Sequence, residues 1–341
     1  MGKKNGNITL LVVLILLPVA FFIASLMLGP YPIGPFDVVK IVLDRFLGTG
    51  YVDNPLAENM IWKIRMPRIL GAVLVGAALS VAGAVFQGLF RNPLASPYTL
   101  GVSNGAGFGA ALAILLSSGA GLNVFFVQLS ALAFGLLSIG ITFLLAAKAR
   151  RSTVTLVLSG MLVGALFSSL VALIKYVADP YDQLPQIVFW LMGTLSGVTY
   201  EKLAMILPLY LPAMTVIFLM RWRINILSMG DQEARSYGVD VKKNRTLVIL
   251  ACSVLTALVV SLAGVIGWVG IVIPHLARII AGHDFRKLVP VSLSLGICYV
   301  LLIDDICRNV TAAEIPLGVV TGIIGTPVFI YFIYKGKVRW E

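Results

Sequence analysis

The chain has 341 residues, of which 59% are hydrophobic and only 12% are charged. Soluble domains typically carry about 25% charged and about 45–50% apolar residues, so this composition excludes a soluble enzyme, a nucleic-acid-binding module and a disordered chain. The apolar share is sufficient for roughly ten membrane spans of about 20 residues each. We therefore expect an all-α polytopic membrane protein, in which the net charge of +11 must first be interpreted by its placement.

Ten apolar runs, bounded by charges or by glycine and proline turns, follow one another along the chain. They fall near 8–28, 69–90, 98–117, 123–146, 153–178, 203–220, 247–263, 265–281, 288–303 and 315–334. The first run is long and lacks a small-residue cleavage site, which predicts a retained helix rather than a signal peptide. Runs seven and eight are separated only by a short stretch around Gly264, so hydropathy alone leaves nine spans open.

The basic residues indicate how the chain is oriented. Both ends carry lysines, which places both termini in the cytoplasm under the positive-inside rule and requires an even number of spans. In the ten-span arrangement, the segments predicted to lie inside are strongly basic and those outside are slightly acidic. The net charge therefore reports topology and requires no nucleic-acid partner.

Two polar segments lie between the runs. Residues 29–64 form an external segment in which 36–47 is apolar on one face and charged on the other, which predicts a helix lying at the outer interface. The longest polar interval on the cytoplasmic side is 228–240, and it is compatible with a helix up to a glycine cap at Gly238. Because no soluble domain is evident, we interpret 1–341 as a single transmembrane domain.

Small residues recur every four positions in several runs, and this spacing lets helix backbones approach closely in lipid. The main sets are Gly101, Gly105 and Gly109 in run three, Gly160, Gly164 and Ser168 in run five, and Gly318 and Gly322 in run ten. Tight packing alone is one interpretation. The other is that runs five and ten present a small, weakly polar face along a pathway, although hydroxyl groups in spans can also bond their own backbone.

Charges inside the membrane, the usual sign of ion coupling, are nearly absent from the runs. Lys175 lies near the outer end of run five, while Asp304 and Asp305 lie at an outer boundary. His275, near the inner end of run eight, is interpreted as a helix-end hydrogen-bonding residue rather than a metal ligand. The sequence has no G-x-x-x-x-G-K-[ST] loop and no Ser/His/Asp set, so we expect no ATPase site, catalytic site, metal site or cofactor.

Three patches rich in Pro, Gly, Asn and Arg occur at helix ends, where irregular backbone needs specific residues. They are Arg65-Met-Pro-Arg68, the stretch 83–101 with Arg91-Asn-Pro-Leu94, and the stretch 263–278 continued in 304–308 and 314–329. Together with Met229-Gly-Asp231 and Tyr237-Gly-Val239, they strongly resemble the iron-chelate and cobalamin permease family. Members of that family are the transmembrane subunits of type II ABC importers. The match is collinear from about residue 60 to about residue 335.

The resemblance implies ten helices with both ends in the cytoplasm of a cell membrane. It also implies three kinds of partner: a second copy of the chain in a homodimer, two cytosolic ATPase subunits and an extracytoplasmic substrate-binding protein. The substrate class would be a metal chelate, with an iron–siderophore complex or haem first, cobalamin as the alternative, and molybdate or tungstate third. A heterodimer with a paralogue remains open at this point.

The family pattern also assigns roles to residues of this chain. The translocation pathway, on the dimer axis, would be lined by Gly160, Gly164, Ser168, Gly318, Thr321, Gly322 and Gly325. A cytoplasmic gate would contain Asn92, Leu94, Ser152 and Thr153. The segment coupled to the ATPase would contain Gly230, Asp231, Ala234, Tyr237 and Gly238. Arg65, Arg68 and Arg308 would dock the binding protein, since the planar arginine fork can hold a carboxylate through two hydrogen bonds.

From the residues alone, each assignment has a plainer alternative. The arginines can snorkel or contact lipid headgroups, Asn92 can simply fix a turn, and the coupling segment can be a solvated helix. Two other classes of function also stay open. An ion-coupled secondary transporter would need buried charges that the runs lack, and a membrane scaffold would not explain the polar interval at 228–240.

Overall fold

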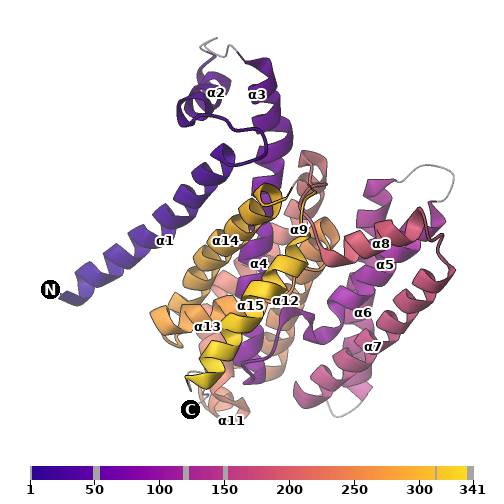
Figure 1. Ribbon diagram of the computed structural model, residues 1–341. Coiled ribbons are helices and arrows are strands. Elements are labelled where there is room, and N and C mark those ends of the chain that lie inside the picture. The colour runs from indigo at the N-terminus through magenta and orange to yellow at the C-terminus, as the bar shows by residue number, and fades with distance from the viewer. Residues whose placement is uncertain (1, 49–53, 118–122, 149–152, 312, 336–341) are drawn as a thin grey trace.

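The computed structural model of the chain describes residues 2–48, 54–117, 123–148, 153–311 and 313–335, with side chains described from residue 12 onward except at 153 and 333. Every regular element in these ranges is a helix (Figure 1). Six of the described helices are long and apolar enough to cross a membrane, and four shorter apolar helices accompany them. They coincide with the ten predicted runs, so the all-α polytopic class is confirmed.

The N-terminal part contains the helix predicted at 36–47 and a second span that is longer than its apolar run. The elements are α1 (Gly2–Met27), α2 (Pro35–Leu47), α3 (Pro55–Asn59), the π-helical turn η1 (Met60–Arg65) and α4 (Met66–Phe90). The helix predicted at 36–47 is α2. The chain is continuously helical over Pro55–Phe90, so Arg65 and Arg68 lie within this helix, well after its start.

The middle of the chain adds one helix that the apolar runs did not indicate. The elements are the 3-10 turn η2 (Pro97–Leu100), α5 (Val102–Leu116), α6 (Val124–Lys148), α7 (Thr153–Val177), α8 (Gln183–Met192) and α9 (Tyr200–Leu219). Helix α8 is short and lies between the predicted runs at 153–178 and 203–220. It positions the site described below.

The C-terminal part shows that runs seven and eight are separate helices. The elements are α10 (Arg221–Met229), α11 (Asp231–Ser236), α12 (Val241–Ala263), α13 (Val269–Ala281), α14 (Phe285–Asn309) and α15 (Leu317–Tyr334). The break between α12 and α13 begins at Gly264, whose φ of +71° favours glycine. A Cβ there would lie 2.2 Å from the carbonyl oxygen of Trp190, so a side chain cannot be accommodated. One long helix through this position is therefore excluded.

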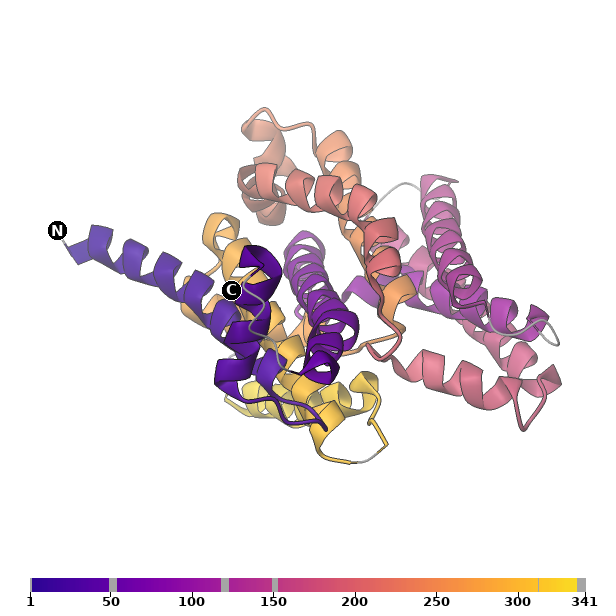
Figure 2. The same ribbon diagram turned by 90° about the horizontal axis from the view of Figure 1, so that it is seen from above.

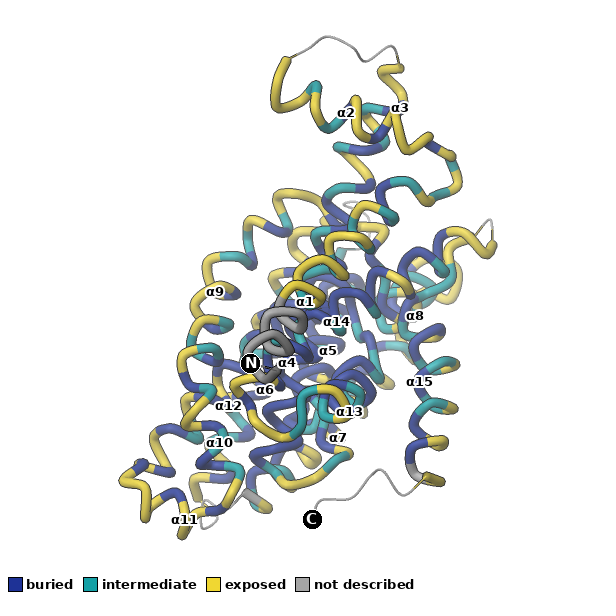
Figure 3. Tube along the Cα trace, turned by 90° about the vertical axis from the view of Figure 1, so that its left-hand side faces the viewer, coloured by how far each residue is buried: buried dark blue, intermediate teal, exposed yellow. Residues whose placement is uncertain are grey.

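Helix α4 lies at the centre of the bundle and packs against its neighbours backbone to backbone (Figures 2 and 3). A Cβ on Gly76 would lie 2.3 Å from the carbonyl oxygen of Gly296 in α14, and one on Gly83 would lie 2.0 Å from that of Gly270 in α13. Small residues permit this approach, which supplies the dispersion contacts that hold helices together where water is absent.

Helices α5, α6 and α7 form a second packed group with its own apolar cluster, and α12 joins this group to α4. Figure 1 shows α2 and α3 at one end of the molecule and α11 at the other. The segments predicted to lie on the external side and on the cytoplasmic side of the membrane are thus at opposite ends of the molecule. The exposed stretches in Figure 3 include these same two ends.

Candidate functional site

The predicted coupling segment is a pair of short helices separated by a glycine. Gly230 has φ 135° and ψ 168°, a conformation that breaks the helix between α10 and α11. A Cβ on Gly230 would lie 2.4 Å from Nη2 of Arg91 and 2.4 Å from a carboxylate oxygen of Glu233. The interval from Ser228 to Gly238 is therefore not one continuous helix, because close contacts and a positive φ bend the chain at Gly230.

Helix α11 ends in the glycine cap that its sequence predicts. Gly238 has a φ of +72°. Its N–H donates to the carbonyl of Arg235 at 2.9 Å, and the N–H of Val239 donates to that of Ala234 at 3.0 Å. This pattern of bonds satisfies the free carbonyls at a helix end. Ala234 is fully buried while Tyr237 is 60% exposed, so α11 is anchored through one face and presents the other.

An ion pair joins α11 to the next membrane helix. Asp231, the first residue of α11, accepts two hydrogen bonds from the guanidinium of Arg245 in α12. This hydrogen bonding, with further positive charge from Arg235 and Arg91, lowers the pKa of Asp231 below its ordinary value. The Asp231 side chain is 52% exposed, so solvent screens the pair.

Arg91, which the sequence analysis did not single out, connects the coupling segment to α4. It ends α4 with φ 48° and donates from Nε to the carbonyl of Ser228 at 3.0 Å. Its position as the basic residue within 83–101 was the available signal. The turn that carries Asn92 and Leu94 thus starts at a residue bonded to α10.

The predicted gate residues in this turn are accessible. The Oδ1 atom of Asn92 accepts from the N–H of Leu94 at 2.9 Å, which fixes the turn as the plainer interpretation of Asn92 expects. Leu94 is 58% exposed. Thr153 is the first residue of α7, but its side chain is not among the side chains that the structure describes. Ser152 lies outside the described residues. A gating role for these four residues stays a prediction.

The small residues of α7 have different surroundings. Gly160 and Gly164 are buried: a Cβ on Gly160 would lie 2.6 Å from the Cα of Leu100, and Asn104 donates from Nδ2 to the carbonyl of Gly164 at 2.9 Å. These glycines pack α7 against η2 and α5. Ser168, in contrast, is exposed, so of this set only Ser168 lies on the free face of α7.

The small residues of α15 let this helix pack against the end of α8 and against the irregular backbone that follows α12. A Cβ on Gly318 would lie 2.4 Å from the carbonyl oxygen of Met192, and one on Gly325 would lie 2.8 Å from the Cβ of Trp268. A Cβ on Gly322 would lie 3.7 Å from Nε1 of the Trp268 ring. Thr321 is fully buried and donates to the carbonyl of Gly318 at 3.1 Å.

Backbone hydrogen bonds tie α8, the α12–α13 break and α15 into one outer junction. The N–H of Thr194 donates to the carbonyl of Ala263 at 2.8 Å, and the N–H of Leu317 donates to that of Gly193 at 2.9 Å. Gly193 has φ 75° and lies against Gly264, with its own Cβ position 2.6 Å from the carbonyl oxygen of Val265. The junction therefore joins α8 to α15 through main-chain contacts.

The free faces of α7 and α15 are largely apolar. The large hydrophobic side chains at least 50% exposed on these two helices are Val154, Leu158, Met161, Leu162, Leu166, Leu173, Tyr176, Val177, Ile323, Ile330, Tyr331 and Tyr334. The described part of these helices contains Lys175 as a charged residue near the outer end of α7 and Lys335 just beyond α15. Such faces offer weak contacts to a bulky solute, to a second copy of the chain or to lipid.

At the outer end of α4, Arg68 lies in a buried ion-pair cluster. Its guanidinium donates to both carboxylate oxygens of Asp304 in α14 at 2.9–3.0 Å and to Glu314, in the loop before α15, at 2.7 Å. Arg68 is 5% exposed and Asp304 is 1% exposed. Three segments far apart in the sequence therefore meet at one side chain.

Arg308 and Arg65 extend the cluster to the end of α1. Arg308 is paired with Asp305, which also accepts from Ser25 Oγ at 2.7 Å. Arg65 donates to the carbonyls of Leu26, Met27 and Tyr31. Arg65 and Arg308 are 2% and 3% exposed. Docking of a partner by Arg65, Arg68 and Arg308 stays a prediction, and direct contact would require these side chains to leave the partners described here.

No group of three or more His, Cys, Asp or Glu side chains within the described ranges is arranged to hold a metal ion. The ring of His275 packs against Phe332 and Phe329, with ring centroids 4.5 Å and 6.3 Å apart. Cys252, Cys298 and Cys307 are buried free thiols.

The chain is similar to known proteins over most of its length. The profile of the FecCD transport family matches residues 14–335. The chain is 38% identical to the molybdate import system permease protein MolB of Haemophilus influenzae, over 95% of each chain. It is 40% identical to the vitamin B12 import system permease protein BtuC of Klebsiella pneumoniae, over 87% of this chain and 88% of the relative.

A third relative and a solved structure agree with these. A probable iron chelatin transport system permease protein of Helicobacter pylori is 37% identical over 82% of this chain and 83% of its own. The solved structure, described as an inward-facing conformation of a putative metal-chelate type ABC transporter, is 36% identical with a TM-score of 0.85. It covers 96% of this chain and 99% of its own length.

Proposed function

The chain belongs to the FecCD transport family and is a multi-pass ABC transporter permease of the cell membrane; we propose that it imports an iron–siderophore complex or haem. In this proposal the chain forms a homodimer and receives its substrate from an extracytoplasmic binding protein. Two cytosolic ATPase subunits supply the energy. ATP binding moves α10 and α11, and the helices around the dimer axis respond so that access alternates between the two sides.

The observation that carries the proposal is the construction of the coupling segment. Helix α11 is capped at Gly238, anchored by the buried Ala234 and exposed at Tyr237, so it can press into a cleft of a partner as a preformed unit. The attachment of the preceding helix α10 to α4 through Arg91 connects the coupling segment to the turn of Asn92 and Leu94. These features support the proposed roles of Gly230, Asp231, Ala234, Tyr237 and Gly238 in coupling.

For the pathway, we propose that Ser168 and the apolar side chains beside it line the cavity on the dimer axis. Gly160, Gly164, Gly318, Thr321, Gly322 and Gly325 act behind that wall, because they set how closely α7 and α15 approach their neighbours. A wall with few charges binds a bulky chelate weakly, which suits transit rather than retention.

Molybdate is a second candidate substrate, favoured by the Haemophilus influenzae relative that matches over 95% of both chains. The two candidates differ in chemistry. An iron–siderophore complex or haem buries apolar and aromatic surface, whereas molybdate is a small hydrated dianion that needs hydrogen-bond donors. Cobalamin is the alternative within the bulky class, with the Klebsiella pneumoniae relative as its support.

Uptake by the reconstituted transporter tests the proposal. The chain, its ATPase and its binding protein are placed in vesicles, and ATP-dependent accumulation of ferric siderophore, haem, cobalamin and molybdate is compared. We expect accumulation of an iron chelate or haem that needs all three components. Uptake without the ATPase would instead indicate a secondary transporter, and uptake of molybdate alone would overturn the iron assignment while leaving the importer class intact.

A further inference from the structure

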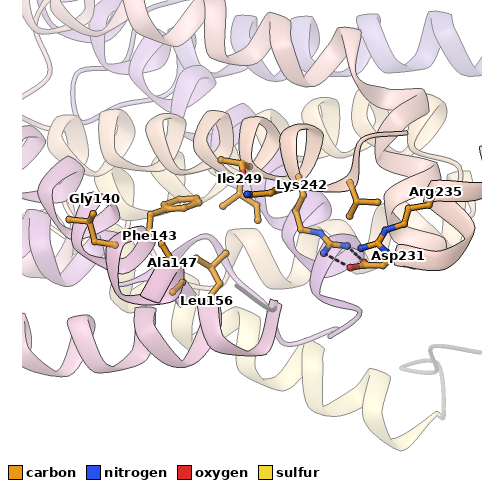
Figure 4. A pocket seen from close by; sticks show the side chains of 13 residues that line it. Gly140, Phe143, Ala147, Leu156, Asp231, Arg235, Lys242 and Ile249 are labelled. Carbon is orange, nitrogen blue, oxygen red and sulfur yellow. Dashed lines mark hydrogen bonds and ion pairs between the residues drawn. The ribbon is translucent and has the colours of Figure 1, made fainter. Parts of the chain in front are cut away.

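A cavity of about 730 Å³ lies near the cytoplasmic ends of α6, α7, α11 and α12, apart from the pathway residues and the arginine cluster (Figure 4). Its wall within the membrane helices is apolar and includes Phe143, Leu144, Leu156 and Ile249. Its other end is formed by Asp231, Arg235, Lys242 and Arg245. The cavity is therefore amphipathic along its length, with its polar end at the coupling helix.

The polar end has more positive than negative charge. Arg235, Lys242 and Arg245 face a single lining carboxylate, Asp231, which pairs with Arg245. Among the described residues, Arg235 and Lys242 have no ion pair. The side chain of Arg245 is only 16% exposed. Its buried Nε atom has no hydrogen-bond partner among the described residues. A buried hydrogen-bond donor without a partner costs free energy unless an acceptor, such as an anion, meets it.

The apolar end has space that the sequence leaves open. Gly140 lines it, and a Cβ built on Gly140 would meet nothing within 4 Å. Ala147 lies two turns further along α6, so the apolar wall of this helix extends for about 10 Å. An inorganic anion would satisfy the cations and leave this wall unfilled, whereas an acyl chain fills it.

We propose that this cavity binds an anionic phospholipid of the cytoplasmic leaflet, with its phosphate at Arg235, Lys242 and Arg245 and an acyl chain along Gly140 and Phe143. The position fits this ligand, because the cavity lies where the membrane helices meet the cytoplasm and lipid headgroups lie at that level. Basic residues near the membrane surface attract anionic lipid. The bound lipid contacts α11 and α12 together and so forms part of the coupling segment's support.

Native mass spectrometry of the purified full-length chain tests the site. The chain is titrated with phosphatidylglycerol, with phosphatidylcholine of identical acyl chains, and with sodium phosphate. We expect phosphatidylglycerol to bind with at least about fivefold preference over phosphatidylcholine, as expected for the loss of about one basic-residue contact. Lys242→Gln should reduce the affinity for phosphatidylglycerol by about fivefold.

A second variant tests the acyl part independently of charge. Gly140→Leu fills open space at an exposed helix position and should weaken phosphatidylglycerol binding while the thermal unfolding transition stays at or above that of the wild type. Lys287→Gln, an exposed basic residue on the same side of the membrane but outside the cavity, is the matched control and should bind as the wild type does.

Three results would overturn the proposal. Equal binding of phosphatidylglycerol and phosphatidylcholine would show that the basic residues do not recognise the headgroup. Equal losses of phosphatidylglycerol affinity in Lys242→Gln and Lys287→Gln would show that any basic residue on this side of the membrane has the same effect. Competition by sodium phosphate with no effect of Gly140→Leu would indicate a site for free phosphate instead of a lipid.

Discussion

The arginine cluster at the outer end and the coupling segment at the cytoplasmic end use the same kinds of side chain in opposite ways. In the cluster, Arg68 and Asp304 are almost completely buried and share several hydrogen bonds. In the coupling segment, Asp231 is half exposed and pairs with one arginine. Burial makes the first arrangement expensive to disturb, while solvent screening leaves the second easy to rearrange. The comparison suggests a fixed outer end and an adjustable inner end.

The largest effect is expected from breaking the outer cluster. Arg68→Met leaves Asp304 as a buried carboxylate without its main partner, and removal of one member of a buried pair costs about 3–5 kcal/mol. We expect a strong drop in thermal stability and in the amount of folded protein in the membrane, measured by fluorescence-detected size-exclusion chromatography. The double variant Arg68→Met/Asp304→Leu should recover part of the loss, since both charges are gone. No recovery would show that the pair itself is not the source of the effect.

The second prediction concerns the bend between α10 and α11. Gly230→Ala places a Cβ against Arg91 and Glu233 at a backbone conformation with φ 135°, so the bend must shift. We expect ATPase activity of the assembled transporter to lose its stimulation by the binding protein, while the stability of the membrane bundle changes by about 1–3 kcal/mol at most. The control is Gly267→Ala, because a Cβ there meets nothing within 4 Å. A wild-type response to the binding protein in Gly230→Ala would contradict the coupling role.

A third prediction separates docking from folding at the outer end. Charge reversal at Arg65 or Arg68 is expected to weaken binding of the binding protein and to raise its salt sensitivity, as the docking role predicts. Because both side chains are buried, the same change is also expected to destabilise the chain. Glu314→Gln alters a 38% exposed member of the cluster and leaves Arg68 its bonds to Asp304. Because Glu314 occupies Arg68 and repels acidic residues of a partner, stronger docking in Glu314→Gln at unchanged thermal stability would locate the docking surface at this cluster. Unchanged docking across a salt titration would argue against it.

The smallest effect is expected at the ion pair of the coupling segment. The folded pKa of Asp231 lies below its unfolded value, so the pair contributes its stability above the unfolded pKa of about 3.9 and loses it as pH falls through the folded pKa. Asp231→Asn should therefore cost less than about 1 kcal/mol near neutral pH, and the difference from wild type should vanish in acid. Thermal unfolding of both proteins across pH 3–7 checks this. A difference that persists in acid would assign the effect to packing instead of charge.

Much of the fold follows from local pattern, because the spacing of apolar residues and the position of charges are properties of short segments. The ten apolar helices, the helix α2 and the cap at Gly238 were all predicted in this way. Helix α8 was missed because its short apolar run lies inside a loop-like segment, and the bend at Gly230 was missed because its cause is contact with Arg91, far away in the chain.

The candidate site divides along the same line. Motifs at helix ends identified the family, and the profile match over 14–335 agrees with that identification. Periodicity alone could not tell which glycines of α7 pack against a neighbour and which small residue faces outward. Gly160 and Gly164 prove to be buried, while Ser168 is exposed, because α5 and η2 cover only one side of α7.

The sequence by itself determined that this protein is a helical membrane protein with a basic cytoplasmic side and a polar segment at 228–240, since hydropathy and charge act locally at each span. Only the tertiary structure decided what its few charges do. Arg68 and Asp304 are 236 residues apart in the chain and form a buried pair, which depends on how α4 and α14 cross. The outer junction of Gly193 and Gly264 likewise exists only because three separate backbones approach more closely than any side chain would allow.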